Sequence, residues 1–329
     1  MKHATRLSDI GLADVDRILA TARAWKDKPH PKHLREKILG MVFFNPSLRT
    51  RASFEAVMSR GGGSAIVIEA GSGSWKLEDR LNVVMDGDRA EHLKEAVPVL
   101  SRFVDVLAVR SFAHGANDDV DHDDAVMRSF QQYATVPTIS LESAREHPCQ
   151  GLADLLTIEE QFEPKCALPV TLTWAPHIKP LPKAVPNSFL LSAAARGCEI
   201  RVAHPKGFEL HPDILGEAQS YAAASGGSIS FFHEQDAALS GSRAVYAKAW
   251  GPATSAQLKP EVVREHADWM MTARQMERAA KDAIFLHCLP VRRNLEVADE
   301  VLDGKWSRVI DQAENRFHVQ RALLDWMLN

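Results

Sequence analysis

The 329-residue chain is poor in cysteine and in long apolar runs, and each scarcity argues against a class of protein. No apolar run approaches the ~20 residues that a membrane-spanning helix needs, and the N-terminal sequence MKHATRLSDIGLADV lacks the apolar core of a signal peptide. The four cysteines are scattered, without the paired spacing of a metal site: Cys149, Cys166, Cys198 and Cys288. We therefore expect reduced thiols in a cytoplasmic protein.

The chain also has no excess of positive charge, since its formal net charge is −4. The net charge therefore gives no electrostatic basis for binding nucleic acid. One acidic run, AHGANDDVDHDDAV from Ala113 to Val126, places His114 and His122 among five aspartates. Its spacing lacks the central glycine and closing glutamate of a calcium loop. We interpret it as a solvated acidic loop rather than a metal site, and we expect no metal and no cofactor.

The length and the composition, 45% hydrophobic and 25% charged, suit a globular protein of two domains. Residues 6 to 30 have apolar positions at helical spacing, and strand-like runs then alternate with helical ones. This alternation predicts an α/β fold of two doubly wound parallel-sheet lobes, with the active site in the cleft between them. The expected domains are residues 1–147 and 148–314, with a C-terminal helix, residues 315–329, packing back on the first.

The elements of the two lobes follow from these runs. The first lobe is expected to contain strands Ile38–Phe44, Ser64–Ile68, Val104–Arg110 and Thr138–Leu141, and helices around Arg51–Ser59, His92–Phe103 and Asp124–Ala134. The second is expected to contain strands Pro169–Trp174, Glu199–Ala203, Ser228–Phe232, Ala244–Lys248, Trp269–Thr272 and Ile284–His287. The helix after His147 is expected to connect the lobes.

The segment from Phe43 to Gly63, FFNPSLRTRASFEAVMSRGGG, reads as the end of a strand, a turn and the start of a helix. A helix N-terminus offers unpaired N–H groups and a partial positive charge. Ser47, Thr50, Arg49 and Arg51 lie at this position, so the segment predicts an anion site, with phosphate the favoured anion. The alternative is a serine N-cap followed by two surface arginines.

A second segment, AIFLHCLPVRRN from Ala283 to Asn294, also runs as a strand into a polar turn. The turn carries His287, Cys288, Arg292 and Arg293. Ligands of open α/β sheets bind beyond the carboxyl ends of the strands. Two such strand ends, from opposite halves of the chain and both rich in arginine, indicate a site to which both lobes contribute.

Together SLRTR, HPCQ (His147 to Gln150) and HCLPVRR resemble the signatures of the aspartate and ornithine carbamoyltransferases, in the same order over almost the whole chain. The resemblance implies transfer of a carbamoyl group from carbamoyl phosphate to an amine. Such a reaction requires that the phosphate be held, the carbonyl polarised and a neutral amine aimed at the carbon, without a covalent nucleophile.

The resemblance also implies residue roles. Carbamoyl phosphate would be bound by Ser47, Leu48, Arg49, Thr50, Trp75, Arg110, His147, Gln150, Cys288, Leu289 and Arg316. Four of these residues would be catalytic. Arg110 would bridge the phosphate and the carbonyl, and His147 and Gln150 would hydrogen-bond the carbamoyl group. Cys288 would orient the amine. The alternatives are salt bridges for Arg110 and Arg316, a turn histidine for His147 and a small buried apolar residue for Cys288.

Trp75 lies in the glycine-rich segment GSGSWKLEDR, where a core residue is unexpected. In the family, the equivalent loop reaches into the site of a neighbouring subunit, which implies a homotrimer with active sites at its interfaces. The alternative is a tryptophan that folds over its own domain.

The acceptor is indicated by YAKAWG, Tyr246 to Gly251, which stands where ornithine enzymes carry Ser-Met-Gly. Lys248 would repel a free α-ammonium group of the acceptor and attract its carboxylate. The alternative is a surface lysine at the end of a strand. These features resemble the N-acylornithine carbamoyltransferases of arginine biosynthesis, which act on an acceptor whose α-amine is masked. The pocket implied for the acylornithine consists of Glu142, His177, Lys248, Arg292 and Ala90.

Ala90, in MDGDRAEHL, bears on the acyl group. The acetyl branch of the family carries glutamate at this place and the succinyl branch proline, and alanine neither crowds nor repels a succinyl carboxylate. We therefore favour N-succinylornithine as the acceptor, with N-acetylornithine as the alternative. The HPCQ motif is more similar to the acetyl branch. Lys179 either binds the distal carboxylate of a succinyl group or is a solvated lysine. Two further hypotheses are an ordinary ornithine or aspartate enzyme and a catalytically silent, carbamoyl-phosphate-binding regulatory subunit.

Overall fold

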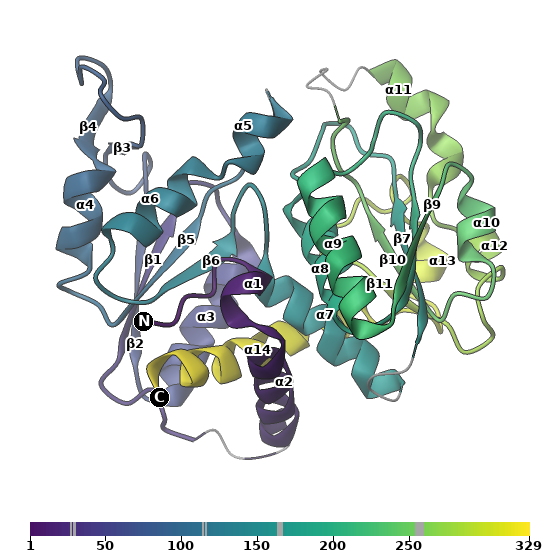
Figure 1. The fold of residues 1–329 in the computed structure, drawn as a ribbon, viewed down its shortest axis with the longest axis horizontal. Coiled ribbons are helices and arrows are strands. Elements are labelled where there is room, and N and C mark those ends of the chain that lie inside the picture. Colours follow the sequence, from purple (N-terminus) through teal and green to yellow (C-terminus); the bar gives the residue numbers. More distant parts are fainter. Residues whose placement is uncertain (27, 29–30, 114, 116, 163–166, 254–259) are drawn as a thin grey trace. The chain divides into compact units, whose positions relative to one another are not determined.

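The computed structural model describes residues 1–26, 28, 31–113, 115, 117–162, 167–253 and 260–329 (Figure 1). Cys166 and His114 lie outside the described residues. The chain forms two compact units, which are considered separately. Unit 1 comprises Met1–Ala113, Asp123–Cys149 and Arg316–Asn329, and unit 2 comprises His114–His122 and Gln150–Asn315. Within the described part of the chain, no helix has the length and apolar character to cross a membrane.

Unit 1 is built on a four-stranded parallel sheet in the order β2-β1-β5-β6. Its strands are β1 (Ile38–Phe43), β2 (Ser64–Glu69), β5 (Val106–Arg110) and β6 (Thr138–Glu142). Its helices are α1 (Leu7–Ile10), α2 (Leu12–Lys26), α3 (Leu48–Gly61), α4 (Leu93–Leu100) and α6 (Ala125–Tyr133). The central strands β1 and β5 are buried along nearly their whole length, as apolar strands covered on both faces must be.

The C-terminal part of α14 (Val309–Leu328) belongs to unit 1 from Arg316 onward and packs on it. The Arg321 guanidinium lies 5.3 Å from the centroid of the Trp25 ring, and Lys2 Nζ donates to the Trp326 carbonyl at 2.6 Å. These contacts attach the end of the chain to its beginning.

Unit 2 is built on a five-stranded parallel sheet in the order β11-β10-β7-β8-β9. Its strands are β7 (Pro169–Trp174), β8 (Glu199–Ala203), β9 (Ser228–Phe232), β10 (Ala244–Lys248) and β11 (Ile284–Leu286). Its helical segments are α5 (Asp118–His122), α8 (Ala184–Ala195), α9 (Pro212–Ser225), α10 (Gln235–Leu239), α11 (Pro260–Glu265), the 3-10 turn η1 (Ala267–Trp269), α12 (Ala273–Met276) and α13 (Asp299–Leu302). Helix α7 (Pro148–Gln161) begins in unit 1 and continues into unit 2.

These two parallel-sheet units confirm the α/β prediction, and each strand of the sheets was anticipated within about two residues. The strand predicted at Trp269–Thr272 is wrong. Trp269 ends the 3-10 turn, and Met271 makes only an isolated bridge to Val297. The helix predicted over residues 6–30 is divided at Gly11, whose φ of 76° is incompatible with a continuous helix.

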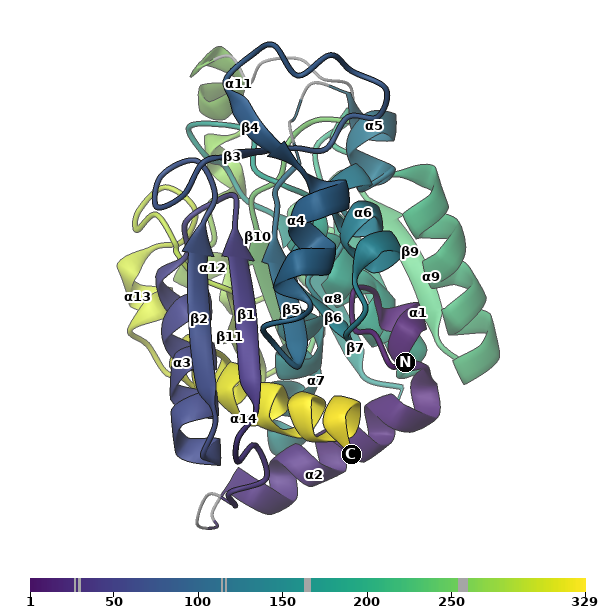
Figure 2. The ribbon, with the colours of Figure 1, turned by 90° about the vertical axis from the view of Figure 1, so that its left-hand side faces the viewer.

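One element was missed by the sequence analysis. Lys76–Glu78 (β3) and Arg89–His92 (β4) pair in parallel as a short ribbon of unit 1, which Figure 2 shows beyond the arrowheads of β1 and β2. Strands of three and four residues are too short for their hydrophobic period to be recognised.

Candidate active site

The predicted anion site forms at the start of α3. Strand β1 ends at Phe43, and Ser47 caps the helix, its Oγ accepting a hydrogen bond from the Thr50 backbone N–H at 3.3 Å. The Thr50 hydroxyl in turn accepts a hydrogen bond of 2.6 Å from Arg316 Nη2. A helix N-terminus, two hydroxyls and a buried guanidinium from the other end of the chain therefore meet within unit 1, as an anion site requires.

Arg51 does not join this group. Its guanidinium contacts Glu55 at 3.1 Å and Glu69 at 2.8 Å, and half of its side chain is exposed. Of the two arginines that the sequence placed at the anion site, only Arg49 lies close enough to Arg316 to disfavour its positive charge. Residues two apart on a helix point in different directions, which explains the separation.

Arg110 and Glu142 form a second part of the unit 1 site. Arg110 Nη1 donates to Glu142 Oε2 at 2.6 Å, and the guanidinium stacks on the Phe112 ring with its carbon 4.4 Å from the centroid. The register of β5 and β6 shifts between Val109 and Arg110, so that Arg110 pairs with Glu142. The Nε–H groups of Arg110 and Arg316 have no hydrogen-bond acceptor in the described part of the chain, and both residues are buried.

His147 completes the residues predicted in unit 1. The imidazole is buried, and burial, followed by the positive charges of Arg316 and Arg110, holds the pKa of His147 well below its usual value of 6.5. The ring is therefore neutral at physiological pH. Burial also raises the pKa of the neighbouring Cys149 thiol to about 12, so this cysteine stays protonated and unreactive.

Trp75 and Ala90 lie on the exposed ribbon of unit 1. Ala90 is an exposed residue of β4. Trp75, 60% exposed, precedes β3, and its indole Nε1–H donates to Glu91 at 2.8 Å. The indole does not fold over the core of its own unit. Leu81 and Val84, in the loop that joins the two strands, are exposed as well.

In unit 2, Gln150 is held by an acid that the sequence analysis missed. Gln150 Nε2 donates to Asp154 Oδ1 at 2.7 Å, and Gln312 Nε2 donates to the same oxygen at 2.6 Å. Because a carboxylate only accepts hydrogen bonds, the amide nitrogen of Gln150 must face Asp154. Its Oε1 then points elsewhere and, among the described residues, has no hydrogen-bond donor. This oxygen is suited to accept from an amide such as a carbamoyl NH₂.

The segment from His287 to Pro290 follows β11. The backbone N–H of His287 donates to Gln312 Oε1 at 2.9 Å, and that of Leu289 to His287 Nδ1 at 2.9 Å. The Leu289–Pro290 peptide bond is cis. Cys288 is 9% exposed, and it lies close enough to the buried Tyr246 hydroxyl to help raise the pKa of that group, which burial raises most. The side chain of Cys288 is thus buried inside unit 2.

The residues predicted to bind the acceptor gather in unit 2 at three neighbouring strand ends. Lys248 ends β10 and is buried, His177 follows β7 and Arg292 follows β11, and these strands are adjacent in the sheet. Arg292 Nε donates to His177 Nε2 at 3.0 Å. Burial lowers the pKa of His177, and Lys248 and Arg292 lower it further. Glu142, by contrast, lies in unit 1.

Glu296 is a second acid that the sequence did not predict, and it lies beside Arg292 and His177. It is 1% exposed, and its carboxylate accepts hydrogen bonds from the Arg292 backbone N–H and from His287 Nε2. Burial alone would raise the pKa of Glu296, but the bond from His287 and the charge of Lys248 hold it below its ordinary value. The carboxylate is therefore ionised.

The acidic run is more structured than predicted. Residues Asp118–His122 form α5, and Asp118 accepts from the Lys183 ammonium at 2.9 Å. In the described residues, His122, His211 and Asp213 form a group of potential metal ligands, with the two imidazoles stacked at 3.8 Å. Both nitrogens of His211 are already used, because Nδ1 caps α9 by accepting from the Asp213 N–H and Nε2 lies 3.1 Å from an Asp119 carboxylate oxygen. The group thus has a helix-capping function that metal binding would disrupt.

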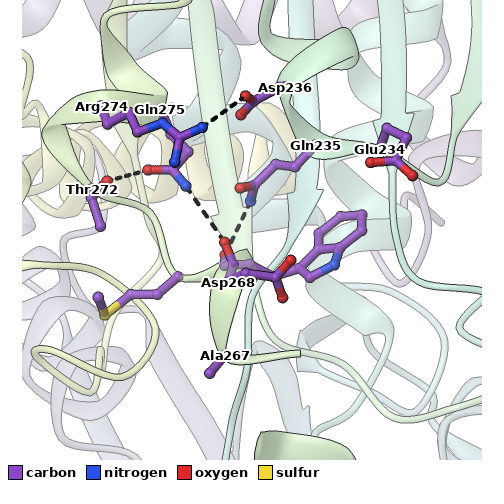
Figure 3. Close-up of a pocket in the computed structure, with 10 residues that line it drawn as sticks. Glu234, Gln235, Asp236, Ala267, Asp268, Thr272, Arg274 and Gln275 are labelled. Carbon is purple, nitrogen blue, oxygen red and sulfur yellow. Dashed lines mark hydrogen bonds and ion pairs between the residues drawn. The ribbon is translucent and has the colours of Figure 1, made fainter. Parts of the chain in front are cut away.

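A separate polar pocket of about 420 Å³ lies in unit 2 and contains none of the predicted site residues (Figure 3). Gln235, at its wall, donates to Thr173 Oγ1 at 2.9 Å and to the Trp269 carbonyl at 3.0 Å. Asp236 forms ion pairs with Arg274 and Arg278. The polar groups at this pocket bond largely to one another.

Comparison with known proteins gives two family matches. Residues 2–160 match the carbamoyl-P binding domain of the aspartate/ornithine carbamoyltransferases, and residues 182–327 match their Asp/Orn binding domain. The chain is 40% identical to N-succinylornithine carbamoyltransferase of Bacteroides thetaiotaomicron, over 96% of this chain and 95% of that protein. It is 37% identical to N-acetylornithine carbamoyltransferase of Xanthomonas campestris, over 98% of this chain and 97% of that protein.

Solved structures agree with these matches. A glutamate-to-alanine variant of N-acetyl-L-ornithine transcarbamylase, complexed with carbamyl phosphate and N-succinyl-L-norvaline, is similar with a TM-score of 0.96 and 37% identity, covering 99% of this chain and all of that one. Acetylornithine transcarbamylase complexed with acetylcitrulline gives a TM-score of 0.96 at 36% identity, with full coverage of both chains.

Proposed function

The chain belongs to the aspartate/ornithine carbamoyltransferase family, and we propose that it transfers the carbamoyl group of carbamoyl phosphate to the δ-amine of N-succinylornithine in arginine biosynthesis. The products are N-succinylcitrulline and phosphate. The observation that carries the choice of an acylated acceptor is the buried Lys248 beside His177 and Arg292. Two cations disfavour a free α-ammonium group and favour a carboxylate.

In this proposal, unit 1 holds carbamoyl phosphate. Its phosphate lies on the N-terminus of α3, bonded by Ser47, Leu48, Arg49 and Thr50, with Arg316 beside them. Arg110 bridges the phosphate and the carbonyl oxygen, where negative charge develops in the transition state. The neutral imidazole of His147 and Oε1 of Gln150 hydrogen-bond the carbamoyl group.

Unit 2 orients the acceptor. Lys248 and Arg292 bind its α-carboxylate beside His177, and the backbone carbonyls of Cys288 and Leu289 direct the amine. The neutral δ-amine attacks the carbonyl carbon, a C–N bond forms, and the C–O bond to phosphate breaks. The departing phosphate takes up the proton that the amine loses, so no protein nucleophile is needed.

The acyl group is inferred from Ala90. The identities to the two relatives, 40% and 37%, are too similar to decide between succinyl and acetyl acceptors. Support comes from the transcarbamylase whose glutamate is replaced by alanine and which was solved with a succinylated ligand. We infer that this glutamate is the one whose place Ala90 takes. An alanine there leaves room for a second carboxylate and does not repel it.

We also propose that the β3–β4 ribbon contacts a neighbouring subunit in a homotrimer. Four apolar side chains are exposed on the ribbon and its loop, more than a soluble surface usually gathers in one place: Trp75, Leu81, Val84 and Met85. Light scattering should give three times the mass of the 36.4 kDa chain, and a monomer at assay concentration would contradict the proposal.

The proposed reaction is tested by measuring citrulline-product formation from carbamoyl phosphate with N-succinylornithine, N-acetylornithine, free ornithine and free aspartate. The proposal expects turnover of the acylated acceptors and a preference for the succinyl compound. Substantial turnover of ornithine or aspartate would instead indicate an ordinary member of the family. No turnover of any acceptor would favour a silent, carbamoyl-phosphate-binding subunit.

A further inference from the structure

We infer that Glu296 is a positioning residue of the acceptor site, whose carboxylate fixes the segment carrying Arg292 and offsets one of the two positive charges above it. The inference rests on the proposed function and deepens it, because nothing in the sequence resemblance assigns Glu296 a role. Glu296 would touch neither substrate; it would act through Arg292 and, by way of Arg292, through His177.

Both hydrogen bonds of Glu296 require a carboxylate. Oε1 accepts from the Arg292 backbone N–H at 3.1 Å, and Oε2 accepts from His287 Nε2 at 3.2 Å. His287 must donate, because its Nδ1 already accepts from the Leu289 N–H at 2.9 Å and the ring proton therefore lies on Nε2. A carboxamide at this position has only one acceptor oxygen, so it would serve one of the two donors and present its NH₂ group to the other.

Glu296 is connected to the proposed acceptor-binding residues through Arg292. The two donors bracket the turn that carries Leu289 and Arg292, so the carboxylate fixes this turn from both sides. Arg292 Nε then donates to His177 Nε2 at 3.0 Å, which requires a neutral His177 with its proton on Nδ1. That nitrogen lies 2.9 Å from the Lys179 carbonyl, which accepts its proton; the Lys179 backbone N–H, 3.2 Å from the same nitrogen, then has no acceptor there. One buried acid thus determines where the Arg292 side chain starts and, through it, the tautomer of His177.

Glu296 also balances charge in the cluster that it forms with Lys248, Arg292, His177 and His287. Lys248, Arg292 and Glu296 are the charged groups of this cluster, and the two histidines are neutral because a ring nitrogen of each accepts a hydrogen bond. Glu296 Oε1 lies 3.8 Å from His177 Nε2, and Lys248 is close enough to favour the ionised carboxylate. The cluster therefore has a net charge of +1, the value that one bound carboxylate neutralises. Without Glu296, the buried Lys248 ammonium would lose the nearby carboxylate that offsets its charge.

The test is the kinetics of Glu296→Gln and Glu296→Asp with N-succinylornithine and N-acetylornithine. For E296Q we expect a rise of about tenfold or more in KM for the acceptor, the size expected when a buried donor loses its charged partner. KM for carbamoyl phosphate should stay within about twofold, because most of the residues proposed to bind it lie in unit 1 and only Cys288 and Leu289 lie in the turn that Glu296 fixes. E296D retains the charge and both acceptor oxygens, so it should recover part of the loss.

Glu277→Gln is the matched control, since Glu277 is an exposed acid of the same unit outside the pocket, and its kinetics should equal those of the wild type. An unchanged acceptor KM in E296Q would overturn the inference. So would an equal rise of both KM values, or an E296D variant no better than E296Q. Failure of the wild type to use any acylornithine would sink the proposed function itself, a result distinct from all of these.

Discussion

Replacing Lys248 with methionine tests how the acceptor is recognised, because the change removes the charge and keeps most of the side-chain volume. Lys248 ends β10 and is 7% exposed, so water screens its charge poorly. Two unit charges 4 Å apart attract by about 4 kcal/mol at an effective dielectric constant of ~20. Part of this is lost to desolvation, and hydrogen bonds to charged groups contribute about 1.5–3 kcal/mol net.

A loss of that size predicts a fall of about 10- to 100-fold in kcat/KM for N-acylornithine, since 1.4 kcal/mol corresponds to a factor of ten. Initial rates should be measured at saturating carbamoyl phosphate, and KM for carbamoyl phosphate should change little. Lys281→Met removes an exposed lysine of the same unit and should have no effect. An acceptor KM within about twofold of wild type in K248M would refute the assignment of Lys248 to the carboxylate.

Three further predictions concern unit 1. Arg49→Ala should abolish turnover and leave the fold intact. Arg51→Ala removes only surface ion pairs with Glu55 and Glu69 and should retain activity. Equal activities of the two variants would contradict the anion site. His147 has a folded pKa below its unfolded value of 6.5, so its contribution to stability is complete above that pH and is lost as the pH falls. Melting temperatures should therefore decline from about pH 7.5 to about pH 5.5 less steeply in His147→Gln than in the wild type, and identical slopes would show that the ring is not buried as a neutral group. Ala90→Glu should shift the ratio of kcat/KM values from succinyl toward acetyl acceptors, and an unchanged ratio would remove Ala90 from the acyl pocket.

The sheets of both units were predictable because parallel strands buried on two faces are nearly continuous apolar runs. The same reasoning failed at Trp269–Thr272. There Trp269 and Met271 are buried although they belong to a 3-10 turn and the loop that follows it. A short apolar run alone does not distinguish a buried strand from a buried loop. The division at Gly11 depends on a backbone angle that a helical pattern of side chains does not reveal.

The acids that hold the candidate site were not predictable in the same way. Asp154 bonds Gln312, 158 residues away in the sequence, and Glu296 is one acid within a polar stretch. Local patterns cannot pair residues so distant. The separation of Arg51 from Arg49 was, by contrast, available from helical geometry, because residues two apart do not share a face.

The central claim, that this carbamoyltransferase uses an ornithine with a masked α-amine, is tested most directly by one assay. Carbamoyl-phosphate-dependent product formation should be measured with N-succinylornithine, N-acetylornithine and free ornithine side by side, at equal concentrations. We predict acylated citrulline from the acylornithines, most from the succinyl compound, and little citrulline from ornithine. Efficient carbamoylation of free ornithine, with little turnover of either acylated compound, would contradict it.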